Sequence, residues 1–345
     1  MRRYMPLMFL SFFLVFLAII GTDLMGHAGE QTPENIKSVV LYTNLPVEQV
    51  SLFAEEYENV GKIHVSIIPL SDQDLLTRLQ TESNGPQADL VLATTAVLDQ
   101  AKANHLLAPV TSEQTDMVPD RFKDKDNLWI GTWYDPIVFA VNRDFAKKLS
   151  QPIAKWADLT KDNNKFRIGM TDFLASEASA NLLYTLQAVE GETATLAFFK
   201  KMHPQIVQYA KFLATPVRMA GMGEVDIAVA VQSESIRYLN DGFPISIVYP
   251  EEGTAFSLTG IALVAHAPHA SDALPFIDWL LQDDAQNLLQ NHKFYFIPTH
   301  PDTKIAKFYE TKHIKLFDSQ PLTVMQQHEL MDKWIQSVRL SPRSF

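Results

Sequence analysis

The sequence lacks cysteine entirely and has only 13 glycines among its 345 residues. Without thiols the chain can form no disulfide, no thiolate metal site, no cysteine nucleophile and no lipid attachment at a cysteine. It also contains neither the Gly-x-Ser-x-Gly motif of a serine nucleophile nor a glycine-rich phosphate loop with lysine. Because no motif pairs a nucleophile with a base, the sequence predicts a protein that is not an enzyme and holds no cofactor and no metal.

The chain is also short of positive charge, with 29 basic against 40 acidic residues and a formal net charge of −11. Nucleic acids and anionic membranes are bound through basic patches, so we expect neither as a partner. A small anionic ligand is not excluded, because local geometry and not net charge recognises it.

No apolar run is long enough to cross a membrane in the usual way. The longest, residues 7–20, has about 14 residues, whereas a spanning helix needs roughly 20. Arg2 and Arg3 precede this run and Gly26-His27-Ala28 follows it, which is the layout of a secretory signal. The sequence therefore predicts a signal peptide at 1–28, cleaved after Ala28, and a periplasmic or extracellular protein. An uncleaved N-terminal anchor is the alternative.

Strand and helix patterns alternate along the rest of the chain. Apolar strand patterns at 38–43, 63–69 and 89–93 are each followed by an amphipathic or capped helix pattern, and the block at 142–250 repeats this order. Such alternation is typical of βαβ units around a parallel sheet. Since the chain exceeds the size of one ordinary core, we expect two lobes.

Several segments, taken in order, carry a family resemblance. They are 88–91 (ADLV) with 106–110 (LLAPV), 133–142 (WYDPIVFAVN), 156–159 (WADL), 223–226 (GEVD), 249–254 (YPEEGT) and 273–286 (ALPFIDWLLQDDAQ). Together they resemble the extracellular solute-binding proteins of ABC importers, in the branch that contains ferric-ion, phosphonate and sugar-phosphate binders. The likeness covers roughly residues 36 to 300.

The resemblance implies an α/β fold of the type 2 periplasmic binding proteins. Two doubly wound lobes with mixed sheets would be joined by crossing strands, with the ligand cleft between them. Lobe 1 is expected at 36–136 and 254–300, and lobe 2 at 137–253. A C-terminal helical segment at 301–345 has no lobe assignment.

Four strand-to-helix turns are expected to line this cleft, because ligands of open α/β sheets lie where the strands end and helix amides converge. The predicted ligand-binding residues are Thr43, Asn44, Thr94 and Thr95 in lobe 1, Tyr134 at the crossing, and Ser176, Gln232, Ser233 and Glu234 in lobe 2. Ordinary helix capping is the alternative for the turns, and core packing is the alternative for Tyr134.

Two positions depart from the family pattern. Glu177 stands where the family's ligand loop has a small residue, and a carboxylate there competes with a bound anion unless it faces solvent. Ser233-Glu234 stands where ferric-ion binders carry two adjacent tyrosines. The sequence therefore predicts no iron binding through this motif.

The resemblance predicts the solute-binding component of an ABC transport system, a monomer that captures a small polar solute and delivers it to a membrane permease. The Thr, Ser and Asn side chains at the cleft suit an oxygen-rich anionic solute, and the two glutamates favour a zwitterion. A protein of the same fold that docks on a membrane sensor kinase is the alternative, and the genes beside this one would distinguish the two.

Overall fold

The computed structural model describes residues 37–161, 165–319 and 321–342. The predicted signal peptide and the first residue assigned to lobe 1 lie outside these ranges. Among the described residues, no helix is both long and apolar enough to cross a membrane.

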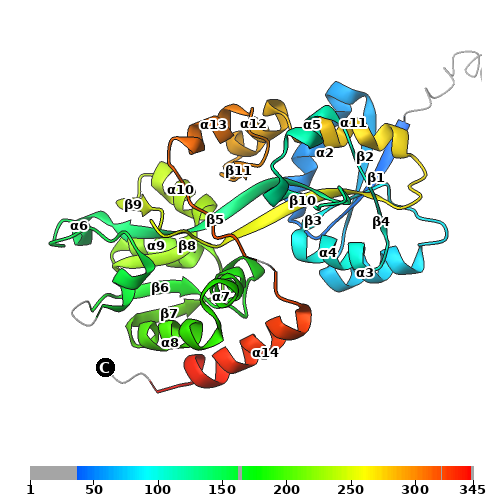
Figure 1. The fold of residues 1–345 in the computed structure, drawn as a ribbon. Helices are drawn as coiled ribbons and strands as arrows, with labels where there is room; N and C mark the ends of the chain where they lie inside the picture. Colours follow the sequence, from blue (N-terminus) through cyan, green and yellow to red (C-terminus); the bar gives the residue numbers. More distant parts are fainter. Residues whose placement is uncertain (1–36, 162–164, 320, 343–345) are drawn as a thin grey trace, which may run out of the picture.

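Lobe 1 is built on a mixed sheet with the strand order β2-β1-β3-β10-β5 (Figure 1). Strands β1 (Lys37–Thr43), β2 (Ile63–Pro69) and β3 (Leu90–Thr94) are parallel, and β10 (Phe256–Val264) and β5 (Ile130–Asn142) run antiparallel to their neighbours. The apolar runs of β1 and β3 are those of strands covered on both faces, whereas the edge strand β2 begins with alternating buried and exposed residues.

Helices cover both faces of this sheet. One layer holds α2 (Val47–Gly61), α11 (Ala270–Leu280) and α12 (Asp283–Asn291), and the other holds α3 (Asp72–Thr81) and α4 (Thr95–Ala103).

The buried carboxylate of Asp89 ties the sheet of lobe 1 to α11. It accepts hydrogen bonds from the backbone N–H of Val40 in β1 at 2.8 Å and from that of His269, just before α11, at 2.7 Å.

Lobe 2 repeats this plan on the other half of β5. Strands β6 (Ile168–Thr171), β7 (Ile206–Ala210) and β8 (Ile227–Val231) are parallel, while β5 and β9 (Ile245–Val248) complete the sheet. Helices α7 (Glu177–Glu190) and α8 (Glu192–Met202) lie on one face, and α9 (Ala214–Met222) and α10 (Gln232–Asn240) on the other. The shorter elements of the chain are β4 (Leu107–Ala108), α5 (Glu113–Met117), α6 (Arg143–Ala146) and the 3-10 helices Asp120–Phe122, Trp156–Thr160 and His203–Gln205.

Strand β5 belongs to both sheets. Its first half pairs with β10 in lobe 1 and its second half with β8 and β9 in lobe 2. Pro136, which has no N–H to donate, lies where the pairing changes from β10 to β8. The two-lobed α/β fold with crossing strands is thus confirmed.

The C-terminal segment divides between the two lobes. β11 (Ile297–Pro298) pairs with β5, and α13 (Lys304–Glu310) packs beside α12. The chain then passes the hinge, where Leu316 pairs with Thr254, and continues into α14 (Val324–Trp334) and a π-helical turn (Ile335–Arg339) on lobe 2. Figure 1 shows α13 and α14 on opposite sides of the molecule.

Trp334 tests the contribution of α14 to lobe 2. Its side chain is 0% exposed in the core of this lobe, and removal of a buried Trp side chain usually costs about 3–5 kcal/mol. We expect Trp334→Ala to lower the free energy of unfolding by that amount in chemical denaturation. Met325→Ala, on the same helix but 72% exposed, should change it by less than about 0.5 kcal/mol. Equal effects would contradict the packing of α14 on lobe 2.

Candidate functional site

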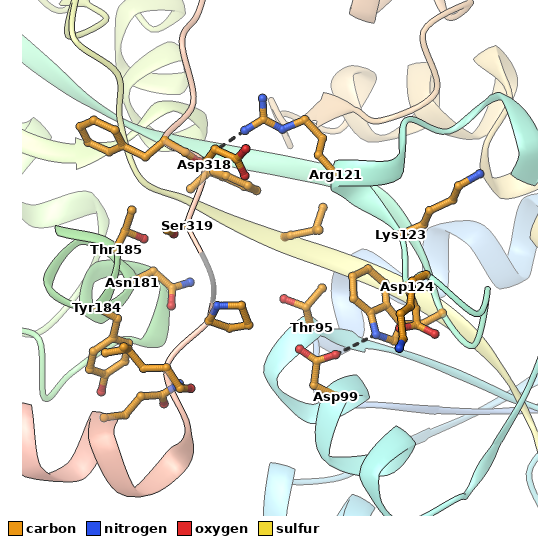
Figure 2. A pocket seen from close by; sticks show the side chains of 18 residues that line it. Thr95, Asp99, Arg121, Lys123, Asp124, Asn181, Tyr184, Thr185, Asp318 and Ser319 are labelled. Carbon is orange, nitrogen blue, oxygen red and sulfur yellow. Dashed lines mark hydrogen bonds between the residues drawn. The ribbon is translucent and has the colours of Figure 1, made fainter. Parts of the chain in front are cut away.

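A cavity of about 510 Å³ lies between the two lobes. Thr95 and Asp99 of α4 face it from lobe 1, and Asn181, Tyr184 and Thr185 of α7 face it from lobe 2 (Figure 2). Its volume is in the range of sites that hold small molecules, about 300–1,000 Å³. Among the predicted ligand-binding residues, only Thr95 lines this cavity.

Aromatic rings from the hinge region close one side of the cavity. Phe256 of β10 lines it, and the ring of Tyr134 stacks on Phe122 with centroids 4.9 Å apart and meets Phe256 edge-on. Tyr134 was predicted to touch the ligand. Its ring is packed among other aromatic side chains, as the alternative of core packing expects, but the residue is partly exposed, so its contact with a ligand stays a prediction.

Arg121 supplies an accessible positive charge at the cavity. Its guanidinium lies over the rings of Phe122 and Phe256 and donates two long hydrogen bonds of 3.4 Å to the carbonyls of Leu316 and Phe317. Within the described part of the chain it forms no ion pair. A planar guanidinium suits a carboxylate or phosphate. No motif marks Arg121 in the sequence, and the prediction missed it.

Glu177 is where the second lobe approaches the first. Loss of hydration between the lobes, and then the nearby Asp72 carboxylate, raise the pKa of Glu177, while a hydrogen bond from the Thr94 hydroxyl opposes them. Glu177 begins α7, the helix whose Asn181, Tyr184 and Thr185 line the cavity, and its charge contributes to raising the pKa of Tyr184. Although solvent still reaches the side chain, it faces lobe 1. The residue is exposed, as the interpretation that it points to solvent expects, and its neighbours across the cleft are Asp72 and Thr94.

The predicted turns of lobe 1 are held by their own hydrogen bonds. Asn44 donates from Nδ2 to Asp72 at 2.8 Å and to the Thr94 hydroxyl at 3.3 Å, and its Oδ1 accepts from the backbone N–H of Thr94 at 3.2 Å. Thr43 is 0% exposed and donates to the carbonyl of Leu92 at 2.7 Å. Its hydroxyl therefore stabilises the sheet edge and does not face the cleft, which corrects the assignment of Thr43.

The predicted residues at the start of α10 are also engaged within the protein. Gln232 accepts a hydrogen bond from the Tyr249 hydroxyl at 2.7 Å and donates to the carbonyl of Tyr295 at 3.3 Å. Ser233 donates to Asp135 through its hydroxyl and its backbone N–H, and Glu234 pairs with Arg237.

Ser176 precedes α7 and makes no capping hydrogen bond. Glu177 follows Ser176 at the first position of α7 and has Thr94 of lobe 1 as a hydrogen-bond partner, while Asn44 is bonded to Thr94 and Thr95 lines the cavity. Their part in ligand binding stays a prediction.

Asp135 is a buried carboxyl group that the sequence prediction passed over. It is 6% exposed in β5 and holds the N-terminus of α10 through Ser233, with distances of 2.6 Å to the hydroxyl and 2.9 Å to the N–H. Burial raises the pKa of Asp135 to about 7, against the opposing hydrogen bonds from Ser233. The signal was present as a single carboxylate inside the apolar stretch 133–142.

This pKa predicts a pH dependence of stability. Between about pH 4 and pH 7, folded Asp135 keeps a proton that the unfolded chain has lost, so stability falls as the pH rises. At about 1.4 kcal/mol per pKa unit, the loss over this window amounts to a few kcal/mol and is complete above pH 7. Asp135→Asn should remove this contribution, as measured by denaturant unfolding from pH 4 to pH 8. Parallel profiles for the two proteins would contradict a raised pKa.

Two α/β lobes joined by crossing strands around a polar cavity define a two-lobed solute-binding protein. The family model for bacterial extracellular solute-binding proteins matches residues 85–316, and the chain belongs to this family. The resemblance seen in the sequence is therefore confirmed.

Of three relatives with similar sequences, one is named for the solute that it binds. An uncharacterised Haemophilus influenzae protein is 27% identical over 312 residues, covering 87% of this chain and 89% of the relative. A probable ABC transporter periplasmic-binding protein of Sinorhizobium fredii is 24% identical over 322 residues, with coverages of 90% and 88%. The Fe(3+)-binding periplasmic protein of Serratia marcescens is 24% identical over 294 residues, with coverages of 81% and 84%.

Solved structures share the fold. The periplasmic binding protein AfuA of Actinobacillus pleuropneumoniae, with fructose-6-phosphate bound, has a TM-score of 0.70 at 24% identity and covers 88% of this chain and 99% of its own. The ferric iron-binding protein A of Mannheimia haemolytica in an open conformation has a TM-score of 0.69 at 18% identity, with coverages of 90% and 100%. These identities are low, so they establish the fold and not the ligand.

Proposed function

We propose that the chain captures a small zwitterionic solute in the cleft between α4 and α7 and delivers it to the membrane permease of an ABC importer. The family, the named ABC transporter relative and the cavity between the lobes support this function. A solute that touches both lobes stabilises the closed state, because closure is favoured only by contacts made better in that state. One relative is named as a probable ABC transporter periplasmic-binding protein, which favours the importer over docking on a sensor kinase.

The observation that carries the proposal is a pair of carboxylates, one from each lobe, that have no ion-pair partner among the described residues. Glu177 approaches Asp72 and Thr94 across the cleft, and in the part of the chain described here neither carboxylate forms an ion pair. An ammonium group placed between the carboxylates would contact both lobes at once. Arg121, at the cavity, would receive the anionic end of the same solute.

A purely anionic solute is the second candidate, because Arg121 has no carboxylate partner among the described residues and AfuA was solved with a sugar phosphate. Iron is not favoured, although iron-binding relatives exist. Ser233 and Glu234 are engaged by Asp135 and Arg237, and the described residues contain no group of three His, Asp or Glu side chains that could hold a metal.

Glu177→Gln separates the two candidates by the sign of its effect. The solute retained through mild purification would be identified by native mass spectrometry and titrated back by calorimetry. For a zwitterion, loss of the charged hydrogen bond should weaken binding by about 10- to 150-fold, equivalent to about 1.5–3 kcal/mol. For an anionic solute, Glu177→Gln removes the repulsion between the carboxylate and the solute and should strengthen binding. That result would refute the ammonium site. Glu192→Gln, at the first position of the next helix, is the matched control and should leave affinity unchanged.

Two hydroxyl variants distinguish the cleft from the start of α10. Thr95→Ala should weaken binding by about 10-fold or more if this side chain meets a charged group of the solute. Ser233→Ala should instead lower the free energy of unfolding by about 1–3 kcal/mol, because the buried Asp135 loses a donor, and should leave affinity nearly unchanged. Calorimetry and denaturant unfolding on both variants measure this. The reverse pattern would move the binding site to α10.

A further inference from the structure

A second cavity, of about 280 Å³, lies in lobe 2 at the C-terminal half of α7. Its wall includes Trp156, Leu186, Phe198 and Phe317. The rings of Trp156 and Phe198 meet nearly at right angles, with centroids 6.3 Å apart. Asn181 and Thr185 of α7 line the inter-lobe cleft and not this cavity, so the two spaces lie along different parts of the helix.

The charged residues that line this cavity are both acidic. They are Glu190, at the end of α7, and Glu252, in the chain that returns across the hinge. Glu252 accepts a hydrogen bond from the backbone N–H of Trp156 at 2.7 Å, which holds one carboxylate oxygen in place. Among the lining residues there is no Lys, Arg or His, and in the described ranges Glu190 forms no ion pair. Carboxylates beside aromatic faces favour a cation that carries an apolar body.

A buried hydroxyl adds an independent indication of a ligand. Thr195 of α8 lines the cavity and is 1% exposed, yet its Oγ1 has no hydrogen-bond partner within the described structure. Buried polar groups are nearly always paired, and each exception calls for an explanation. The oxygen has almost no accessible surface of its own, so a donor on a bound molecule would satisfy it after rotation about the Cα–Cβ bond of Thr195.

We propose that this cavity is a second binding site, for a small organic cation in which an ammonium is attached to a ring or short alkyl chain. The occupant would lie against the hinge, because the Trp156 indole N–H donates to the carbonyl of Gly253 at 2.9 Å. Phe317 lines both cavities, so the second site adjoins the solute cleft without sharing its polar groups.

The test compares 2-phenylethylammonium with its neutral isostere 2-phenylethanol, titrated into the full chain and followed by calorimetry or ligand-observed NMR. The amine should bind at millimolar concentration or below and at least tenfold more tightly than the alcohol. Glu190→Gln and Glu252→Gln should each weaken the amine several-fold. Glu252→Gln keeps an acceptor for the Trp156 N–H. Ala194→Phe, which fills the cavity from α8, should abolish binding while the melting temperature stays near that of the parent.

Two controls make a failure informative. Glu192 begins α8 outside the cavity and pairs with Lys333. Glu192→Gln therefore removes a nearby charge and should leave the affinity for the amine unchanged. Glu177→Gln should also leave it unchanged, since Glu177 belongs to the proposed solute cleft. Equal binding of amine and alcohol, no binding of the amine at millimolar concentration, or loss of binding in Glu177→Gln alone would each overturn the second site. The last result would still support the ammonium site of the cleft.

Discussion

The pairing of β5 with both sheets is the constraint on which the architecture depends. Thirteen residues, buried except for partial exposure at Tyr134, form one strand that is hydrogen-bonded to β10 at its start and to β8 and β9 at its end. Because one strand belongs to two cores, the lobes are held at one side by the crossing and can change their separation at the other. This arrangement produces the cleft between the lobes. It also sets α4 opposite α7 and brings the carboxylate of Glu177 toward that of Asp72.

The fold could be predicted well because buried positions in strands and helices produce a regular pattern of apolar residues along the sequence. Apolar runs at 38–43 and 89–93 marked strands covered on both faces, and the stretch 133–142 marked the crossing. The C-terminal segment could not be assigned in the same way. The amphipathic pattern of α14 indicates that one face of the helix is buried, but it does not indicate which lobe covers that face. The packing of Trp334 in the core of lobe 2 shows which lobe it is.

The site was predicted only in outline, since a hydroxyl at a strand end can face a ligand or bond within the protein. Thr43 and Thr95 both lie at a strand-to-helix turn, yet Thr43 bonds the carbonyl of Leu92 while Thr95 lines the cleft. Ser233 is directed inward by Asp135, a partner 98 positions away. Arg121 had no signal at all, because its place at the cavity depends on a loop and on the returning C-terminal chain. Such long-range pairings do not appear in local patterns.

Closure of the two lobes on one solute is the central claim, and the absence of cysteine makes it directly measurable. Spin labels on Ser83→Cys in lobe 1 and Lys200→Cys in lobe 2, both exposed positions, report the separation of the lobes by pulsed electron resonance. On addition of the co-purified solute, the distance distribution should shift to a shorter and narrower population, and Glu177→Gln should reduce that shift at equal solute concentration. An unchanged distribution at saturating solute would contradict the account.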